Sequence, residues 1–138
     1  MSLLDLTEIL DEVEDAQEPT ILEKGTEAQL RIVSVRGGSA GKQNCDYFSP
    51  VFEIMGHPLA KEFSTFLWVP TKDKLSEKAF ARSLYEIKVF AKCFGIDLSK
   101  PIDYEDDLPG MTGWAILGTS SSEEYGDQNT IGKFITPK

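Results

Sequence analysis

The order of its expected strands and helix constrains the fold of this chain more than any other feature. Five runs alternate apolar with polar side chains or are rich in β-branched and aromatic residues, as is typical of strands. These runs are residues 26–36, 47–54, 62–69, 111–119 and 129–135. Between the third and fourth runs, the apolar residues of 76–94 recur at helical spacing, which predicts one amphipathic helix.

This order predicts a mainly β protein: a five-stranded OB-fold barrel with one helix between strands 3 and 4, an architecture used mainly to bind oligonucleotides or oligosaccharides. Ser76 is a suitable N-cap for the helix and Gly95 a suitable C-cap. The stripe expected to face the core consists of Phe80, Leu84, Ile87, Ala91 and Phe94. In run 62–69 both faces carry large apolar groups, so we expect one face in the core and the other as an exposed aromatic platform.

The chain divides into an acidic N-terminal arm, residues 1–20, and an OB-fold domain, residues 21–138. The arm holds seven of the 23 acidic residues and no Lys or Arg, so the net charge of -9 for the whole chain falls to -2 for residues 21–138. Its apolar residues recur at helical spacing, as a short amphipathic helix requires: Leu3, Leu6, Leu10 and Val13. An isolated helix of this length is marginal in water, so a frayed and solvated arm is the alternative.

Composition bounds the compartment and the cysteine chemistry. No run of 18 apolar residues is present, so we expect no membrane span. The first residues lack the basic and apolar regions of a secretory signal, which predicts a cytoplasmic protein. Cys45 and Cys93 have no metal-type spacing and are expected to be reduced thiols.

The sequence contains no convincing catalytic constellation, and we expect no enzyme activity, metal or cofactor. Its one histidine, His57, lies in a Gly-His-Pro turn. The acidic residues of 103–107 lack the alternating ligands and central glycine of an EF-hand and are expected to form a solvated connector. The glycine-rich segment 37–42 lacks the spacing of a phosphate-binding P-loop.

Function is therefore sought in a binding surface. Single-stranded nucleic acid is held by aromatic faces that stack on bases and by cations that follow the backbone. In an OB-fold these groups come from strands 2 and 3 and from two loops, here expected at 37–46 and 119–128. The aromatic candidates for stacking are Tyr47, Phe66, Trp68 and Tyr125, with Phe48 as a further surface or core aromatic. The candidate cations are Arg31, Arg36, Lys42, Lys72 and Lys133.

Residues 21–135 resemble small OB-fold single-stranded DNA-binding proteins encoded by tailed phages and prophages. The matching motifs are Gly25 before the first strand, the glycine-rich segment, Tyr47-Phe48-x-x-Val51-Phe52-Glu53-Ile54, Phe90-Ala91-Lys92-Cys93-Phe94-Gly95-Ile96, Leu108-Pro109-Gly110 and Asn129. The resemblance implies a protein that protects single-stranded DNA during replication or recombination, in the host cytoplasm if it is phage-encoded.

The chain departs from that family in where its acidic residues lie. Many such proteins recruit partners through an acidic C-terminal tail, whereas this sequence ends Thr136-Pro137-Lys138 and carries its acids at the front. Recruitment of replication or recombination proteins would then fall to residues 1–18, which could instead compete with DNA for the groove. The alternative function is a protein-interaction OB module without nucleic-acid binding, which the net charge favours. The sequence leaves the oligomeric state open, a homo-oligomer included.

Overall fold

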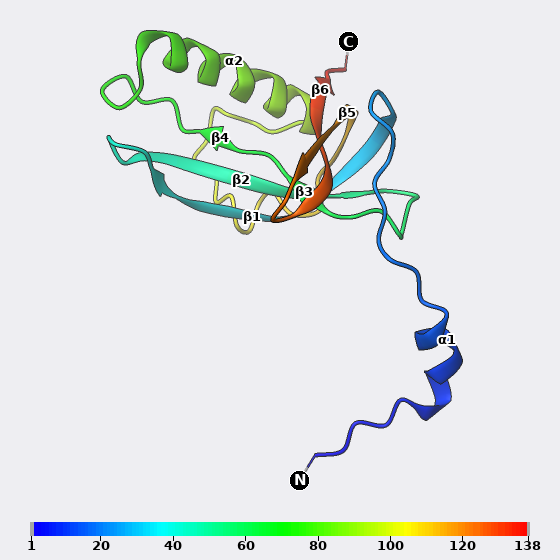
Figure 1. Ribbon diagram of the computed structural model, residues 1–138. Coiled ribbons are helices and arrows are strands. Elements are labelled where there is room, and N and C mark those ends of the chain that lie inside the picture. The colour runs from blue at the N-terminus through cyan, green and yellow to red at the C-terminus, as the bar shows by residue number, and fades with distance from the viewer. Residues whose placement is uncertain (1, 138) are drawn as a thin grey trace.

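Strand β1 (Glu27–Ala40) lies at the centre of the fold and pairs along both of its edges. The computed structural model describes residues 2–137, so Met1 and Lys138, the outermost residues of the two predicted segments, lie outside the described residues. The other elements, in chain order, are η1 (Thr7–Ile9), α1 (Leu10–Glu14), β2 (Cys45–Ile54), β3 (Phe63–Ser64), β4 (Leu67–Trp68), α2 (Glu77–Phe94), β5 (Thr112–Ser122) and β6 (Gly126–Ile135). In Figure 1, α2 covers one side of the curved sheet and the N-terminal arm extends from the other.

The strands form one open antiparallel sheet of six strands in the order β3-β2-β1-β5-β6, with β4 also paired to β2. The protein is therefore mainly β, as predicted, but the prediction of a five-stranded barrel is wrong in strand number and in closure. β3 and β6, at the two ends of the sheet, lie close together. No ladder joins them within residues 2–137. Helix α2 follows β4, so it separates the fourth strand from the fifth.

The extra strand arises because Thr65 and Phe66 divide the predicted strand 62–69 into β3 and β4. Pro50, opposite this break on β2, has no N–H to donate to a ladder. Its carbonyl accepts a hydrogen bond from the Thr65 N–H at 3.2 Å, and the Ser49 hydroxyl donates to the Thr65 carbonyl at 2.7 Å. These two bonds replace the regular ladder at the break and leave Phe66 on the surface.

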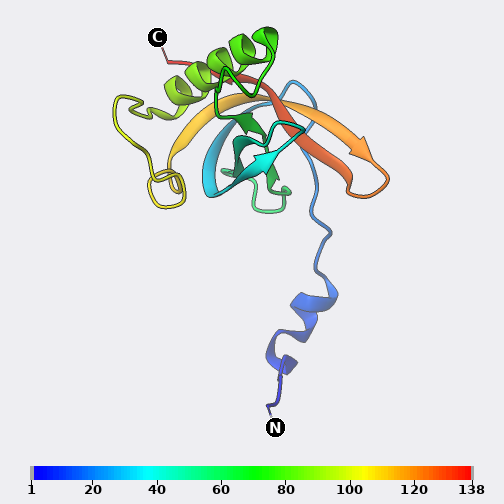
Figure 2. The same cartoon turned by 90° about the vertical axis from the view of Figure 1, so that its left-hand side faces the viewer.

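The loops predicted at 37–46 and 119–128 are wrong, because the strands on either side continue through them. β1 and β2 remain paired as far as the turn 41–44, and β5 and β6 as far as the turn 123–125. At the first turn, Gly41 and Asn44 adopt positive φ angles of 80° and 52°. Both hairpins extend beyond the core, as Figure 2 shows for the β5–β6 hairpin, so small and polar residues are tolerated in their strands.

Helix α2 was predicted almost to the residue. The Ser76 hydroxyl accepts a hydrogen bond from the Ala79 N–H at 3.2 Å, and Gly95 ends the helix in the left-handed conformation. One part of the predicted core stripe is wrong, since Leu84 is 48% exposed. The stripe that faces the sheet begins at Ser83, which is buried, and continues through Ile87 to the buried Phe90 and Phe94. The predicted stripe is confirmed at Ala91 and Phe94, but towards the N-terminus the buried residue is Ser83 in place of Leu84.

The centre of the core is a cluster of phenylalanine rings. Phe52 of β2 stacks on Phe94 of α2 at 5.7 Å between ring centroids and contacts Phe63 at 5.5 Å. Phe134 of β6 packs edge-on against Phe52, Phe90 and Phe94. Because these rings come from strands near both ends of the sheet, the cluster holds the open sheet in its curved shape without a closing ladder.

Asn129 is a buried polar residue that fixes the entry of the chain into the sheet. Its side-chain oxygen accepts a hydrogen bond from the Leu22 N–H at 3.0 Å, and its amide nitrogen donates to the carbonyls of Leu22 and Gly118 at 2.9 and 3.1 Å. One side chain on β6 therefore satisfies both backbone groups of a residue that has no strand partner.

The N-terminal arm contains η1 and α1, and the side chains of residues 2–19 are exposed. Figures 1 and 2 both show it extending away from the sheet on the side opposite α2. Its α-helix is limited to Leu10–Glu14, shorter than the apolar stripe suggests. The arm joins the body at Thr20, whose N–H donates to the Leu59 carbonyl at 2.8 Å. In residues 2–137, the helices are all too short or too polar to cross a bilayer.

We expect Asn129→Ala to lower the free energy of unfolding by about 2–3 kcal/mol, because it leaves buried backbone groups of Leu22 and Gly118 without partners. The measurement is urea denaturation followed by circular dichroism. The matched control is Gln128→Ala on the same strand, which makes no side-chain hydrogen bond within the described residues and should change stability by less than about 0.5 kcal/mol. Equal effects of the two substitutions would contradict the role given to Asn129.

Cys93, on the inner side of α2, is a buried thiol with a shifted pKa. Its Sγ donates to the Trp114 carbonyl oxygen at 3.2 Å, and a Cβ on Gly113 would lie only 2.7 Å from the same sulfur. Burial is the main cause that raises the pKa of the Cys93 thiol to about 11. Since the unfolded thiol ionises near pH 9, this group's contribution is complete below pH 9 and is lost as the pH rises toward 11.

The free energy of unfolding should therefore fall by about 2 kcal/mol more between pH 9 and pH 11 in the wild type than in Cys93→Ala. The change with pH is compared, so a lower starting stability of the variant does not affect the result. Guanidinium titrations at closely spaced pH values measure it. Parallel curves for the two proteins would show that Cys93 does not ionise with a raised pKa.

Candidate nucleic-acid interface

Three of the predicted aromatic residues, Tyr47, Phe66 and Trp68, lie together on the outer face of the sheet, and we call them the aromatic triad. The rings of Tyr47 and Phe66 are stacked with their centroids 4.6 Å apart. Trp68 meets Phe66 edge-on at 4.7 Å and Tyr47 edge-on at 6.4 Å. Phe66 is 44% exposed, and the other two are half-buried.

The strand register places the triad on this face. Tyr47 on β2 is paired with Trp68 on β4, and residues paired in this way project from the same face of a sheet. Their neighbours Phe48 and Leu67 are likewise paired and project into the core side. Phe66 reaches the outer face because the break between β3 and β4 leaves it outside the ladder. The predicted aromatic platform is therefore the face of Phe66 and Trp68, and the core face is that of Phe63 and Leu67.

Two adjacent glycines on β1 allow aromatic rings to lie against both faces of the β1–β2 hairpin. A Cβ on Gly38 would lie 3.0 Å from the Tyr47 hydroxyl oxygen and 3.2 Å from its ring. A Cβ on Gly37 would clash with the hydroxyl oxygen of Tyr104, on the opposite face. Gly37 and Gly38 are thus part of strand β1 and do not form the predicted flexible loop. Their lack of a side chain lets the two rings pack closely against the strand.

The candidate arginines lie on the same outer face as the triad. Arg36 is paired with Ser49, one alternate position along β1 from Gly38. Arg31 lies further along the strand and forms an ion pair with Glu53, its cross-strand neighbour. This is the one ion pair that the structure records in the chain from residue 2 to 137. Arg36 is consequently the better placed of the two to meet a phosphate near the triad.

The candidate lysines Lys42 and Lys72 lie on the two segments that flank the triad. Lys42 is in the β1–β2 turn, where a Cβ on its neighbour Gly41 would lie 3.8 Å from the Trp68 ring. Lys72 lies after β4, with its Nζ 5.9 Å from the centre of the Phe80 ring. A lysine that the sequence analysis missed, Lys74, joins the two segments by donating from its Nζ to the Asn44 carbonyl at 3.2 Å.

Lys133 and Phe66 line one groove of about 440 Å³ between β4, α2 and β6. Tyr85 of α2 lines the same groove and is 65% exposed. The sequence analysis missed Tyr85 because the helical pattern was read only for its core stripe. An exposed aromatic residue one position beyond the stripe was the available signal.

Tyr125 is the predicted site residue that the structure does not bring to the triad. It lies in the β5–β6 turn, where its N–H donates to the Ser122 hydroxyl at 3.0 Å. In the described residues its ring forms no aromatic pair with the triad. The β5–β6 hairpin therefore forms a separate projection.

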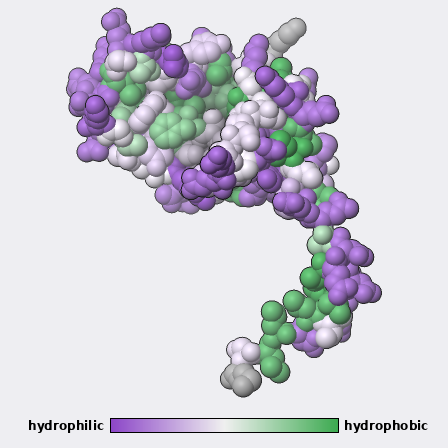
Figure 3. All heavy atoms as spheres, in the orientation of Figure 1, coloured by the Kyte–Doolittle hydropathy of each residue, from purple (hydrophilic) through white to green (hydrophobic). Residues whose placement is uncertain are grey.

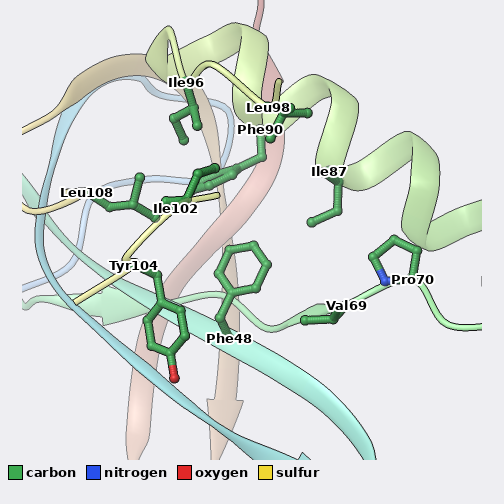
Figure 4. Close-up of a pocket in the computed structure, with 10 residues that line it drawn as sticks. All are labelled: Phe48, Val69, Pro70, Ile87, Phe90, Ile96, Leu98, Ile102, Tyr104 and Leu108. Atoms are coloured by element: carbon green, nitrogen blue, oxygen red, sulfur yellow. The ribbon is translucent and has the colours of Figure 1, made fainter. Parts of the chain in front are cut away.

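An apolar cavity of about 310 Å³ lies on the opposite face of the β1–β2 hairpin from the triad (Figure 4). Phe48 and Tyr104 form one wall, and Ile87 and Phe90 of α2 lie across from them. The sequence analysis did not decide whether Phe48 is a surface or a core residue. The structure places its side chain on the core side of the sheet. The acidic connector turns back here, with the N–H groups of Glu105 and Asp106 donating to the Asp103 carboxylate.

Comparison with known proteins assigns no family: none of the family models matches the sequence, and no curated protein is significantly similar to it. The arrangement itself offers ring faces at the surface, with Arg36 on the same face, and no cluster of three potential metal-ligating side chains within residues 2–137. Such a surface can stack on planar groups and attract anions.

The packing of Tyr104 against Gly37 gives a test of the hairpin geometry. We expect Gly37→Ala to lower the free energy of unfolding by about 1–3 kcal/mol, because the new methyl group displaces the Tyr104 ring. In a Tyr104→Ala background the same substitution should cost much less, and the difference between the two values is the coupling energy. Urea denaturation of the four proteins measures it. Additive effects would mean that the two residues are not in contact.

Proposed function

We propose that this protein binds single-stranded DNA, with bases stacked on the aromatic triad and phosphates held by Arg36, Lys42 and Lys72. The observation that carries the proposal is the gathering of three aromatic rings on one sheet face, with Arg36 on the same face and Lys42 in the adjacent turn. Stacking is worth roughly 1–3 kcal/mol per base and tolerates any sequence, so it suits a protein that covers DNA without sequence preference.

The groove beside Phe66 extends this path. A strand that stacks on Phe66 would continue toward Tyr85 and Lys133, which line the same groove. Arg31 would contribute less than Arg36, because its guanidinium is already paired with Glu53. Tyr125 would contact only a strand long enough to reach the β5–β6 hairpin. DNA contact is thus concentrated on β2, β4 and the segments beside them.

The sheet order supports an open variant of the OB arrangement. If β3 and β4 are taken as one interrupted strand, the order becomes 3-2-1-4-5, with the helix after the third strand and the first and last positions close together. In OB-folds the strand 2–3 face carries the nucleic acid, and the triad lies on the equivalent face. A role in replication or recombination, and kinship with the phage and prophage proteins, belong to this proposal.

The net charge of -9 argues against DNA binding, but most of it lies away from the triad. Residues 21–138 carry a net charge of only -2. The arm, which carries the other seven negative charges, extends away from the sheet in Figures 1 and 2. A modest local excess of cations then suffices, because stacking supplies much of the affinity. Binding should still weaken as salt is added.

Trp68→Ala should weaken binding to a fluorescent oligo-dT strand by about tenfold or more, since a stacking platform is lost. Fluorescence anisotropy at low and moderate salt measures the affinity, and the remaining Trp114 reports on folding. Trp114→Ala is the matched control: Trp114 is 47% exposed, and its partner Gln29 lies nine residues along β1 from Gly38, roughly 30 Å from the triad.

Equal affinities for Trp68→Ala and Trp114→Ala would remove the triad from the binding site. A wild-type protein that fails to bind oligo-dT even at low salt would overturn the proposal and favour the second candidate, a protein-interaction module. That candidate is supported by the net charge of -9 and by the exposed apolar side chains of Leu84 on α2 and Leu98 after it.

A further inference from the structure

The N-terminal arm carries a large exposed apolar surface for its size. Leu3 is 89% exposed and Leu10 is 50% exposed, and Leu4, Leu6, Ile9 and Val13 are exposed as well. Figure 3 shows these apolar groups along the arm, with hydrophilic groups beside them. Exposed apolar surface that is contiguous and flanked by charged residues is typical of a segment that docks on a partner.

A second apolar surface lies on α2 and the segment that follows it. Leu84, Ile87 and Ala91 of α2 form a shallow groove with Ile96 and Leu98, and we call it the α2 groove. It adjoins the apolar cavity of Figure 4, which shares Ile87, Ile96 and Leu98 with it. Leu84 and Leu98 are both about half exposed, so the groove is open to a partner.

The charges of the two surfaces are complementary. The arm contains seven acidic residues and no basic ones. The α2 groove is lined by Lys88 and Lys92, with Asp97 as its one acidic residue. On a helical wheel through the arm, Glu12 and Glu14 flank the apolar stripe of Leu6, Leu10 and Val13, so a docked arm would bring carboxylates toward the rims of the groove.

We propose that the arm of one chain docks as an amphipathic helix in the α2 groove of a second copy of the protein. Its leucines fill the apolar groove and its acidic residues meet Lys88 and Lys92. A groove that receives a short amphipathic helix is a common mode of recognition. Docking also explains how so short a helix is stabilised, because burial of an apolar face supplies what an isolated helix lacks.

The position of the arm favours a second copy over the same chain. The Thr20 N–H is bonded to the Leu59 carbonyl, and Asn129 holds Leu22, so the exit of the arm is fixed. From there the arm extends away from α2 in both Figures 1 and 2, with the sheet between them. To occupy its own groove the arm would have to reverse direction around the sheet, whereas a neighbouring molecule can offer its groove directly.

The test is sedimentation equilibrium of the full-length protein without DNA, over a wide range of concentrations, so that its result is independent of the proposed function. We expect reversible self-association. It should weaken about tenfold or more in Leu6→Asp/Leu10→Asp and in Lys88→Glu/Lys92→Glu. All four positions are exposed, and circular dichroism verifies that each variant is folded. The matched controls are Leu59→Asp, as exposed as Leu10, and Lys78→Glu, on α2 outside the groove. Both should associate as the wild type does.

Charge reversal gives the sharper result. Glu12→Lys/Glu14→Lys should also weaken self-association, and an equimolar mixture of it with Lys88→Glu/Lys92→Glu should form a complex, because the arm of one then matches the groove of the other. Three outcomes would overturn the proposal: a monomer at every concentration, a dimer that persists in Leu6→Asp/Leu10→Asp, or a monomer whose arm is protected from hydrogen exchange. The last would mean that the arm occupies its own groove.

Discussion

The structure depends on the double pairing of β1. Its first residues, Glu27 to Arg31, pair with β5 on one edge while Leu30 onward pairs with β2 on the other. Past a bulge at Val33, β1 leaves β5 and continues with β2 alone as a hairpin. A bulge bends a strand and increases its twist. The first part of β1 therefore joins the two halves of the sheet, and the part after the bulge extends with β2 beyond the core as a hairpin. The aromatic triad exists because that hairpin has two accessible faces.

Sequence patterns predicted the features that are set locally. The caps at Ser76 and Gly95 define α2, because each satisfies backbone groups at one helix end, and the buried face of β1 follows from simple alternation. The strand break at Thr65 and the length of the hairpins could not be predicted, since both depend on which residues lie opposite. Pro50 lies opposite the break. Gly37 and Gly38, which as a sequence are typical of a loop, lie in a strand because they pair with Phe48 and Tyr47 of β2.

The candidate site was predictable in its residue types and less so in its geometry. Alternation in 62–69 separated Phe63 and Leu67 from Phe66 and Trp68, but both faces are apolar, and only the packing of Phe63 against Phe52 decides which is buried. Contacts between distant segments could not be predicted from the sequence. Examples are the hydrogen bond from Lys74 to the β1–β2 turn and the ion pair of Arg31 with Glu53. Tyr125 was predicted to join the site because a long loop was expected at 119–128. The paired strands β5 and β6 instead continue to the turn and hold Tyr125 away from the triad.

The protein separates its surfaces by charge as well as by position. Arg36 lies on the face of the aromatic triad and Lys42 in the adjacent turn, whereas the arm carries seven acidic residues and no Lys or Arg and extends away from the sheet. Under the proposed function, an arm with basic residues would compete with the triad for DNA, and a neutral arm would associate without preference for a basic groove. Acidic residues exclude the arm from phosphates while they direct its leucines toward lysines. Under the two proposals, the acidic charge that argues against nucleic-acid binding in the composition keeps the two binding surfaces from competing, because most of it lies on the arm.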